Sequence, residues 1–165
     1  MSASGEKSNL WKWIGIGLVV ILVIIQFIPV NRDNPEVTSE IQAPTDVKQI
    51  LERSCYDCHS NTTRWPWYSY IAPASWLVSY DVHEAREHMN LTRWDTYSPK
   101  DRLEYIEEMW EEVEEGEMPL WYYEIPHPKS RLSDADVQIF NRWVTGIVGN
   151  TNVESENSDH EDHEH

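Results

Sequence analysis

The hydrophobic positions of the chain form one long unbroken run near the N-terminus and shorter periodic stretches beyond residue 44. Residues 13–30 read WIGIGLVVILVIIQFIPV, in which Gln26 is the one strongly polar side chain. At about 1.5 Å per residue, a helix over this run is about 27 Å long, close to the thickness of the hydrocarbon layer of a bilayer. The pattern therefore predicts one N-terminal transmembrane helix over residues 13–30.

The residues that flank this run predict its orientation. Lys7 and Lys12 precede it, and Arg32 is the only basic residue that follows it closely. Because the cytoplasmic side of a span carries the excess of basic residues, residues 1–12 are expected in the cytoplasm and the rest of the chain outside it. A cleaved signal peptide is the alternative, but residues 27–31 offer no cleavage site of small residues.

Four stretches with apolar residues at helical spacing follow, and they predict a single all-α domain over residues 45–149. Ser98 as N-cap, Pro99 at the first position and Gly116 at the end mark the third helix, and Ser133 is the N-cap of the fourth. The four expected helices cover residues 45–55, 73–88, 98–116 and 133–149. The apolar side of the second helix is expected to comprise Trp76, Leu77, Tyr80, Val82 and Ala85.

Two polar segments flank this domain. Residues 31–44 contain two prolines and no periodicity, so they are interpreted as a linker, either an extended tether or a segment that lies on the domain. Thr45 is the expected N-cap of the helix that follows. Residues 150–165 are too polar to fold alone and are expected to form a disordered acidic tail. The alternative for the tail is a weak metal site made by His160, His163 and His165.

The sequence Cys55-Tyr56-Asp57-Cys58-His59 has the pattern C-x-x-C-H and contains both cysteines of the chain. This pattern is the attachment signature of c-type haem. Two thiols three positions apart can each add to one vinyl group of the macrocycle, and the adjacent histidine then lies beneath the iron as its proximal ligand. The motif therefore predicts one haem c per chain, attached to Cys55 and Cys58, with His59 on the iron.

Two other interpretations of the cysteine pair are weaker. A dithiol redox pair is expected near a βαβ pattern, and the sequence shows none. A structural zinc site needs four ligands, yet the expected domain contains no second C-x-x-C and no H-x3-H pair. Covalent haem is therefore the favoured interpretation.

The motif leaves the sixth position of the iron to be filled from elsewhere in the chain. Met118, which precedes Pro119 in an expected loop, occupies the place where many cytochromes c carry a methionine ligand. Thioether ligation opposite histidine raises the reduction potential. Packing in the core is the alternative role for Met118. The rival iron ligands are His127, His83, His88 and Met109.

The stretch after the motif is rich in aromatic residues and contains Pro66, which disfavours helical backbone before it. Arg64, Trp65 and Trp67 are expected in a loop at the haem edge. There Arg64 could pair with a propionate while the two tryptophans cover the ring. A solvent-facing aromatic turn is the alternative, although exposed clusters of large apolar groups are uncommon.

The formal net charge of the chain is -16, from 29 acidic and 13 basic residues. Nucleic acid is a poor partner for such a chain because phosphate binding needs clustered lysine and arginine. The charge instead favours a redox partner with a basic surface, whose approach it can steer. Solubility alone is the alternative explanation.

The segments CYDCHSNTTRWPWYSYIAPASW, DVHEAREH and EMP together resemble the bacterial haem-binding domain family of small, membrane-anchored proteins similar to cytochrome c. The resemblance covers nearly all of residues 45–148 and is strongest over 55–88. It implies a cytochrome c-like haem domain of about four helices with long aromatic-rich loops. It also implies haem bound through Cys55 and Cys58, His59 as proximal ligand, and a location on the periplasmic side of the inner membrane.

Together these expectations describe a membrane-anchored c-type cytochrome that passes single electrons between redox partners and is not an enzyme by itself. Two alternatives stay open. One is a haem peroxidase or a gas or redox sensor whose sixth ligand is absent or displaceable. The other is a docking module in which the haem is structural. In each case haem completes a small core, so the apo form is expected to be poorly folded.

Overall fold

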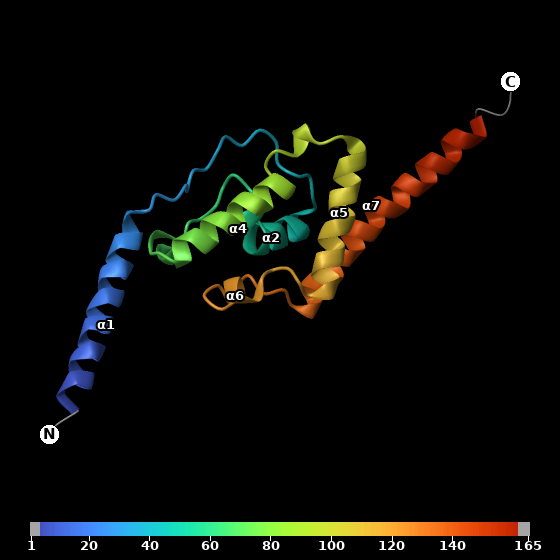
Figure 1. The fold of residues 1–165 in the computed structure, drawn as a ribbon. Helices are drawn as coiled ribbons and strands as arrows, with labels where there is room; N and C mark the ends of the chain where they lie inside the picture. Colours follow the sequence, from blue (N-terminus) through green and yellow to red (C-terminus); the bar gives the residue numbers. More distant parts are fainter. Residues whose placement is uncertain (1–3, 162–165) are drawn as a thin grey trace. The chain divides into compact units, whose positions relative to one another are not determined.

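The computed structural model describes residues 4–161, with side chains over residues 9–149. In this part of the chain the regular structure is helical and no strand is formed, as the sequence predicts (Figure 1). One isolated bridge joins Ser39 and Arg93. The chain divides into two compact units, a first unit of residues 1–33 and 64–83 and a second unit of residues 34–63 and 84–165.

The first unit begins with α1 (Ser4–Ile24), which continues as the short 3-10 helix η1 (Ile25–Phe27). Over Asn9–Phe27 this helix is long and apolar enough to span a membrane, and its large side chains are exposed. The sequence predicts a span over residues 13–30, whereas the apolar helix in the structure begins earlier, at Asn9, and ends earlier, at Phe27. Pro29 explains the earlier stop, since a proline disfavours helical backbone at the residue before it.

The end of this helix is hydrogen-bonded to a later segment of the first unit. The Gln26 amide donates from Nε2 to the carbonyl oxygen of Ala72 at 3.2 Å and accepts through Oε1 from the Ala72 N–H at 2.9 Å. Arg32 donates to the carbonyl oxygen of Ser69 at 3.1 Å and lies over the Tyr70 ring, 4.5 Å from its centroid. The segment that contains Ser69 and Ala72 is thereby fixed where the helix ends.

The next helix, α4 (Ala74–His88), has nearly the bounds that the sequence predicts, but only part of its expected apolar side is buried. Ser75 and Val82 are buried, and the Ser79 hydroxyl donates to the carbonyl oxygen of Asn31 at 2.8 Å. Serines occupy the inner side because the chain that leaves η1 passes close to the helix there. Val82 belongs to the expected apolar side, but the largest residues of that side are exposed, namely Trp76, Leu77 and Tyr80, at 36%, 49% and 62%.

The second unit contains the remaining helices and several short turns that the sequence did not predict. Its elements are α2 (Thr45–Ser54), α3 (Tyr56–His59), η3 (Trp94–Thr96), α5 (Pro99–Glu115), α6 (Trp121–Glu124) and α7 (Asp134–Glu161). The predicted ends of α5 are confirmed, because Ser98 and Asp101 form a capping box and Gly116 adopts a left-handed conformation with φ of 74°. The cap position of α2 is Pro44, so Thr45 is the first helical residue and not the N-cap.

The last helix, α7, is longer than the sequence predicts. It continues past Gly149, so residues 150–161 of the expected disordered tail are helical in the structure. No proline interrupts this segment, and a glycine costs only about 1 kcal/mol relative to alanine, so Gly146 and Gly149 do not end the helix. The histidine side chains of the alternative metal site lie outside the described residues.

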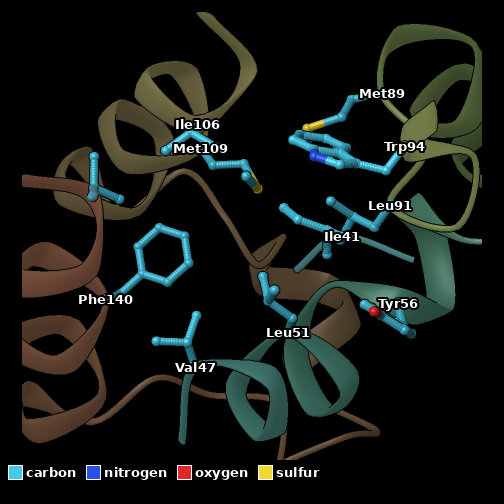
Figure 2. Packing of buried hydrophobic residues seen from close by; sticks show 11 residues of the cluster. Ile41, Val47, Leu51, Tyr56, Met89, Leu91, Trp94, Ile106, Met109 and Phe140 are labelled. Atoms are coloured by element: carbon cyan, nitrogen blue, oxygen red, sulfur yellow. The ribbon is translucent and has the colours of Figure 1, made fainter. Parts of the chain in front are cut away.

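One hydrophobic core holds the second unit together (Figure 2). Val47 and Leu51 of α2 face Met109 of α5, and Phe140 of α7 lies between the two helices. α7 packs against both α2 and α5, so the last helix contacts the helix before the motif. Burial of each such side chain stabilises the fold by about 1.5–3 kcal/mol. The remaining core residues are Ile41, Tyr56, Met89, Leu91, Trp94, Ile106 and Val144.

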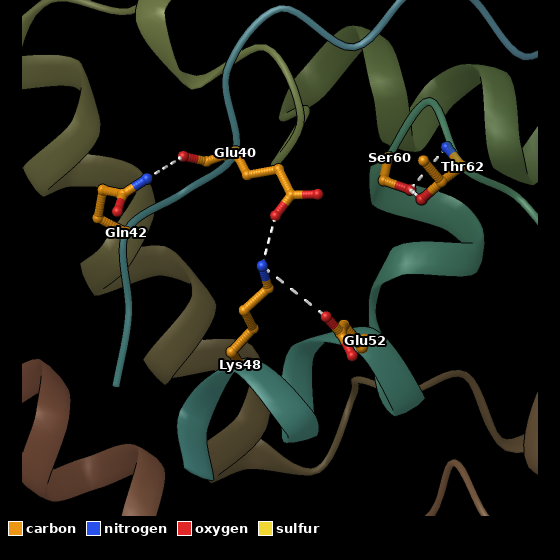
Figure 3. A network of polar contacts seen from close by, with 6 residues as sticks. All are labelled: Glu40, Gln42, Lys48, Glu52, Ser60 and Thr62. Carbon is orange, nitrogen blue, oxygen red and sulfur yellow. Dashed lines mark hydrogen bonds and ion pairs between the residues drawn. The ribbon is translucent and has the colours of Figure 1, made fainter. Parts of the chain in front are cut away.

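Residues 34–44 are extended and lie on the second unit, which is one of the two arrangements that the sequence allowed. The Ile41 N–H donates to the carbonyl oxygen of Leu91 at 2.8 Å, and the Ile41 side chain is buried in the core. Lys48 of α2 forms an ion pair of 2.6 Å with Glu40 (Figure 3). This part of the linker is therefore bound along the unit and is not a free tether.

An ion pair between Arg53 and Asp136 joins the end of α2 to the start of α7. The Asp136 carboxylate lies 2.9 Å from the Arg53 guanidinium and accepts hydrogen bonds from the N–H and the hydroxyl of Ser133, at 2.9 Å and 2.7 Å. Burial raises the pKa of Asp136, but the Ser133 hydrogen bonds and the Arg53 charge outweigh it and leave this pKa below its ordinary value.

Asp136→Asn tests this contact through the pH dependence of stability. Because the native pKa of Asp136 lies below that of the unfolded chain, its carboxylate contributes stability that is present above about pH 4 and is lost as the pH falls through the native pKa. We expect the unfolding free energy of the variant, measured in urea, to fall less than that of the parent between about pH 5 and pH 2. Asp134→Asn at an exposed position is the control. Coincident pH profiles for Asp136→Asn and the parent would contradict the assignment.

Candidate haem site

The C-x-x-C-H residues form a single helical turn directly after α2. The N–H groups of Cys58 and His59 donate to the carbonyl oxygen of Cys55 at 3.1 Å and 2.9 Å, which winds the motif into α3. Residues three and four apart in a helix lie on one face. Both thiols and the imidazole therefore belong to the same face of this turn, and all three residues are half-buried.

A backbone carbonyl orients the imidazole of His59. Its Nδ1 lies 3.2 Å from the carbonyl oxygen of Met89. A carbonyl accepts and cannot donate, so Nδ1 carries the proton and the neutral ring keeps its lone pair at Nε2. Burial lowers the pKa of His59, which favours this neutral form. An imidazole with one nitrogen hydrogen-bonded and the other available is the form that ligates a metal.

A buried polar network holds the Met89 segment against the end of the motif. Asn90 donates to the side-chain oxygen of Asn61 at 2.7 Å, and its own Oδ1 accepts from the N–H and the hydroxyl of Thr92, at 3.0 Å and 2.8 Å. The Thr92 hydroxyl in turn accepts from the Asn61 N–H at 2.8 Å. All three residues are buried, so a donor or acceptor left unpaired there would cost about 1–3 kcal/mol.

Arg86, near the end of α4, holds the turn after the motif from a second side. Its guanidinium donates to the carbonyl oxygen of Ser60 at 2.7 Å, to the Thr63 hydroxyl at 2.7 Å and to the side-chain oxygen of Asn34 at 2.8 Å. Within the turn, the hydroxyls of Ser60 and Thr62 lie 2.7 Å apart (Figure 3). The residues that follow His59 therefore have little freedom to move away from it.

The electrostatics of the motif distinguish between the possible uses of a C-x-x-C pair. Burial raises the pKa of Cys55 to about 12, and the positive charge of Arg53 opposes this only weakly. Dithiol redox sites depend on a thiolate whose pKa is lowered to about 3.5–7.5, so Cys55 does not suit that chemistry. Within the described part of the chain, no group of three or more His, Cys, Asp or Glu residues could hold a metal ion by itself. A zinc site therefore has no support there.

One hydrogen bond joins the segment after α5 to the motif. The Tyr123 hydroxyl, on α6, donates at 2.7 Å to the carboxylate of Asp57, which lies between the two cysteines. Met118 is half-buried in the loop before α6, where its N–H donates to the carbonyl oxygen of Glu112 at 3.1 Å. The contact places α6 beside α3, and the loop that carries Met118 leads directly into α6.

The rival iron ligands have other surroundings. Met109 is 8% exposed in the hydrophobic core, as its place in the apolar stripe of α5 suggests. His88 is exposed, with Nε2 3.1 Å from a carboxylate oxygen of α5, and His83 is exposed on α4. His127 stacks on the ring of Tyr123, with centroids 4.4 Å apart. Among the rival ligands, His127 therefore lies close to Tyr123, the residue whose hydroxyl contacts α3.

The expected pocket residues Arg64, Trp65 and Trp67 belong to the first unit. Trp67 begins the 3-10 helix η2 (Trp67–Tyr70), which the sequence did not predict, and its side chain is 75% exposed. Trp65 is half-buried, and its indole N–H has no hydrogen-bond partner among the described residues. The role of these three residues at a haem edge stays a prediction.

The family model of the haem-binding domain matches residues 20–146 of this chain, which is most of its length and includes the whole C-x-x-C-H turn. The helical fold and the site define a haem protein, and the chain belongs to the haem-binding domain family. This confirms the resemblance drawn from the motif and its neighbours. No curated protein and no solved structure matches the chain.

Sequence reasoning missed the contacts that orient the site. The carbonyl of Met89 carries no sequence signal, since every residue has one. The pairing of Asn61 with Asn90 and Thr92 had a weak signal, because Asn90 and Thr92 alternate in the sequence with Met89 and Leu91, which are core residues. A polar residue inside an apolar stretch often belongs to a buried, fully paired network.

Asn90→Ala tests the network that positions His59. The change leaves the side-chain oxygen of Asn61 and the N–H of Thr92 without the partner that Asn90 provides. We therefore expect the unfolding free energy of the haem-loaded protein to fall by about 1–3 kcal/mol in urea denaturation. Asn141→Ala, the same change on α7 outside this network, is the control and should alter the unfolding free energy by less than about 0.5 kcal/mol. Equal effects of the two substitutions would contradict the role given to Asn90.

Proposed function

We propose that this haem protein is a membrane-anchored c-type cytochrome that transfers single electrons on the extracytoplasmic side of the bacterial inner membrane. The observation that carries the proposal is the geometry of α3, where two thiols and an imidazole share one face and His59 Nδ1 is bound to the Met89 carbonyl. Cys55 and Cys58 would form thioether bonds to one haem, and Nε2 of His59 would be the proximal ligand of its iron.

The surroundings of the motif suit a cofactor that exchanges electrons. Bound haem supplies the one-electron chemistry of iron. Burial at the motif raises the pKa of Cys55 and lowers the pKa of His59, and both shifts disfavour the charged form of the side chain. The site that the chain supplies is therefore of low polarity. Such a site favours whichever state of a bound group carries less charge. We assign the protein no enzymatic activity of its own.

Met118 is proposed as the sixth ligand of the iron. It lies in a loop, so its thioether can turn towards the iron without breaking helical hydrogen bonds. The hydrogen bond between Tyr123 and Asp57 supports the assignment, because it holds the segment that follows Met118 against the turn with the two cysteines. His127, stacked on Tyr123, is the alternative ligand.

Two further features support the proposed location and partner. The apolar helix over Asn9–Phe27 is long enough to cross a bilayer, and the basic residues before it favour a cytoplasmic N-terminus. This orientation puts the motif on the side of the membrane where covalent haem attachment occurs. The net charge of -16 favours a redox partner with a basic surface.

Covalent attachment is tested by producing the full chain in a bacterium with and without cytochrome c maturation machinery. We expect a haem-stained band on a denaturing gel only with the machinery, because thioether bonds survive denaturation whereas bonds from histidine or methionine to iron do not. Replacing both cysteines, by Cys55→Ser and Cys58→Ser together, should abolish the stain. Unstained parent protein from the native host, with both thiols open to alkylation, would contradict the proposal.

Met118→Ala tests both the sixth ligand and the electron-transfer role. We expect the parent to titrate as a one-electron couple and to bind carbon monoxide slowly, because its iron has two protein ligands. The variant should have a lower reduction potential and should bind carbon monoxide rapidly. His127→Ala is the control and should retain the spectrum and potential of the parent. Rapid carbon monoxide binding by the parent would favour a gas sensor or a peroxidase instead.

A further inference from the structure

The first unit carries an exposed apolar surface, which we call the aromatic face. No charged residue lies between Arg64 and Asp81, although 25% of the chain is charged. Exposed apolar surface of this extent, without charge, marks a contact with an apolar partner. The aromatic face comprises Trp67, Tyr70, Ile71, Trp76, Leu77 and Tyr80, which are 36–75% exposed.

The hydrogen bonds of Gln26 fix the position of this face along α1 and η1. Gln26 lies inside the apolar stretch Asn9–Phe27, one residue before its end, and shares two hydrogen bonds with the backbone of Ala72. A bilayer that holds this stretch therefore has the Ala72 backbone at its edge. Ile71, the neighbour of Ala72 in the chain, is 49% exposed and belongs to the aromatic face.

Side chains around this point have the character of residues at a membrane interface. Arg32 follows the apolar stretch and lies over the ring of Tyr70, 4.5 Å from its centroid. Tyrosine and tryptophan are enriched at this depth because their rings are apolar and their polar groups can reach water. Arginine near the end of a span extends its charged group to the headgroup level.

The orientation of α4 gives an independent reason for an apolar surrounding. Its inner side carries Ser75, Ser79 and the small apolar residue Val82, whereas the larger Leu77 and Tyr80 face outwards. A helix on the surface of a water-soluble domain normally has the opposite arrangement, with its large apolar side chains inside. The reversed arrangement is favourable if the outer side meets lipid.

We propose that the aromatic face is a second membrane-contact surface, which lies in the headgroup region of the bilayer that α1 spans. The inference rests on the membrane anchor of the proposed function. Lipid is the partner that the contacts favour, because Gln26 and Ala72 make the face continuous with the span. The absence of charge also removes the repulsion that an acidic surface would meet at anionic headgroups.

The experiment uses the full haem-loaded chain in vesicles of phosphatidylethanolamine and phosphatidylglycerol and in native membranes. The photoreactive residue benzoylphenylalanine replaces Trp67 or Tyr80 on the aromatic face. It replaces Leu18 as the positive control within the span and Trp121, on α6, as the matched control. Trp121 is 72% exposed, against 75% for Trp67. The haem absorption spectrum of each variant verifies that it is folded. Two positions on the aromatic face are used so that the test can still be made if one variant does not fold.

After illumination we expect the mass of the variants at positions 67, 80 and 18 to increase by one phospholipid. We expect no increase above background for the variant at position 121. A lipid adduct at position 18 with none at positions 67 and 80 would contradict the proposed membrane contact of the aromatic face. It would still support the membrane anchor. The lack of a lipid adduct at Leu18 would overturn the anchor and the inference with it. In native membranes, an adduct of Trp67 with haem or with another polypeptide would assign this surface to the haem pocket or to a protein partner, against the proposal.

Discussion

The hydrogen bond from His59 to the carbonyl of Met89 is the contact on which the proposed haem site depends. Without it the imidazole could rotate, and either ring nitrogen could carry the proton. With it the ring has one tautomer, one orientation and one available nitrogen. The lowered pKa of His59 acts in the same direction, because protonation would remove the lone pair at Nε2. Geometry and protonation are thus set together by burial and a single backbone acceptor.

The two sides of the proposed haem site, one around His59 and one around Met118, differ in how many hydrogen bonds hold them in place. On the side of His59, three buried residues form a closed set of hydrogen bonds, and Arg86 joins a second set around the turn. On the side of Met118, the contact to the motif is the bond from Tyr123 to Asp57, at a half-buried position. His59, the proposed proximal ligand, is therefore held more firmly than the loop that carries Met118. If Met118 is the sixth ligand, as proposed, ligand exchange or a tuned potential would arise at that loop.

The elements that could be predicted from the sequence are those governed by local chemistry. The ends of α5 follow from Ser98, Pro99 and Gly116, each of which acts within a few residues of itself. The haem-binding family was likewise predicted from the motif, whose thiols and imidazole stand at a fixed local spacing. Ser133 and Asp136 likewise place the start of α7 correctly, since Ser133 accepts from the Asp136 N–H at 3.2 Å.

The features that the sequence did not predict depend on contacts between distant segments. Periodicity grouped Trp76 and Tyr80 on one side of their helix, but it cannot tell which side of a helix meets the rest of the protein. The position of Ser79 beside Asn31 decided that question. The far end of α7 was missed for another reason, since a polar composition lowers the gain from burial without forbidding helical backbone. The network around Asn90 joins residues 61 and 92, and no local sequence pattern predicts that two such distant residues lie together.

The uneven distribution of charge gives the chain two different kinds of surface. α5 carries glutamates along most of its length, and these contribute to a long-range negative field that weakens as salt rises. Residues 65–80 carry no charge, so their interactions depend on contact area and hardly on salt. Near an anionic bilayer, an acidic surface is repelled whereas an uncharged aromatic surface is not. In a chain with a net charge of -16, this uncharged segment therefore meets the least electrostatic opposition at an anionic membrane surface.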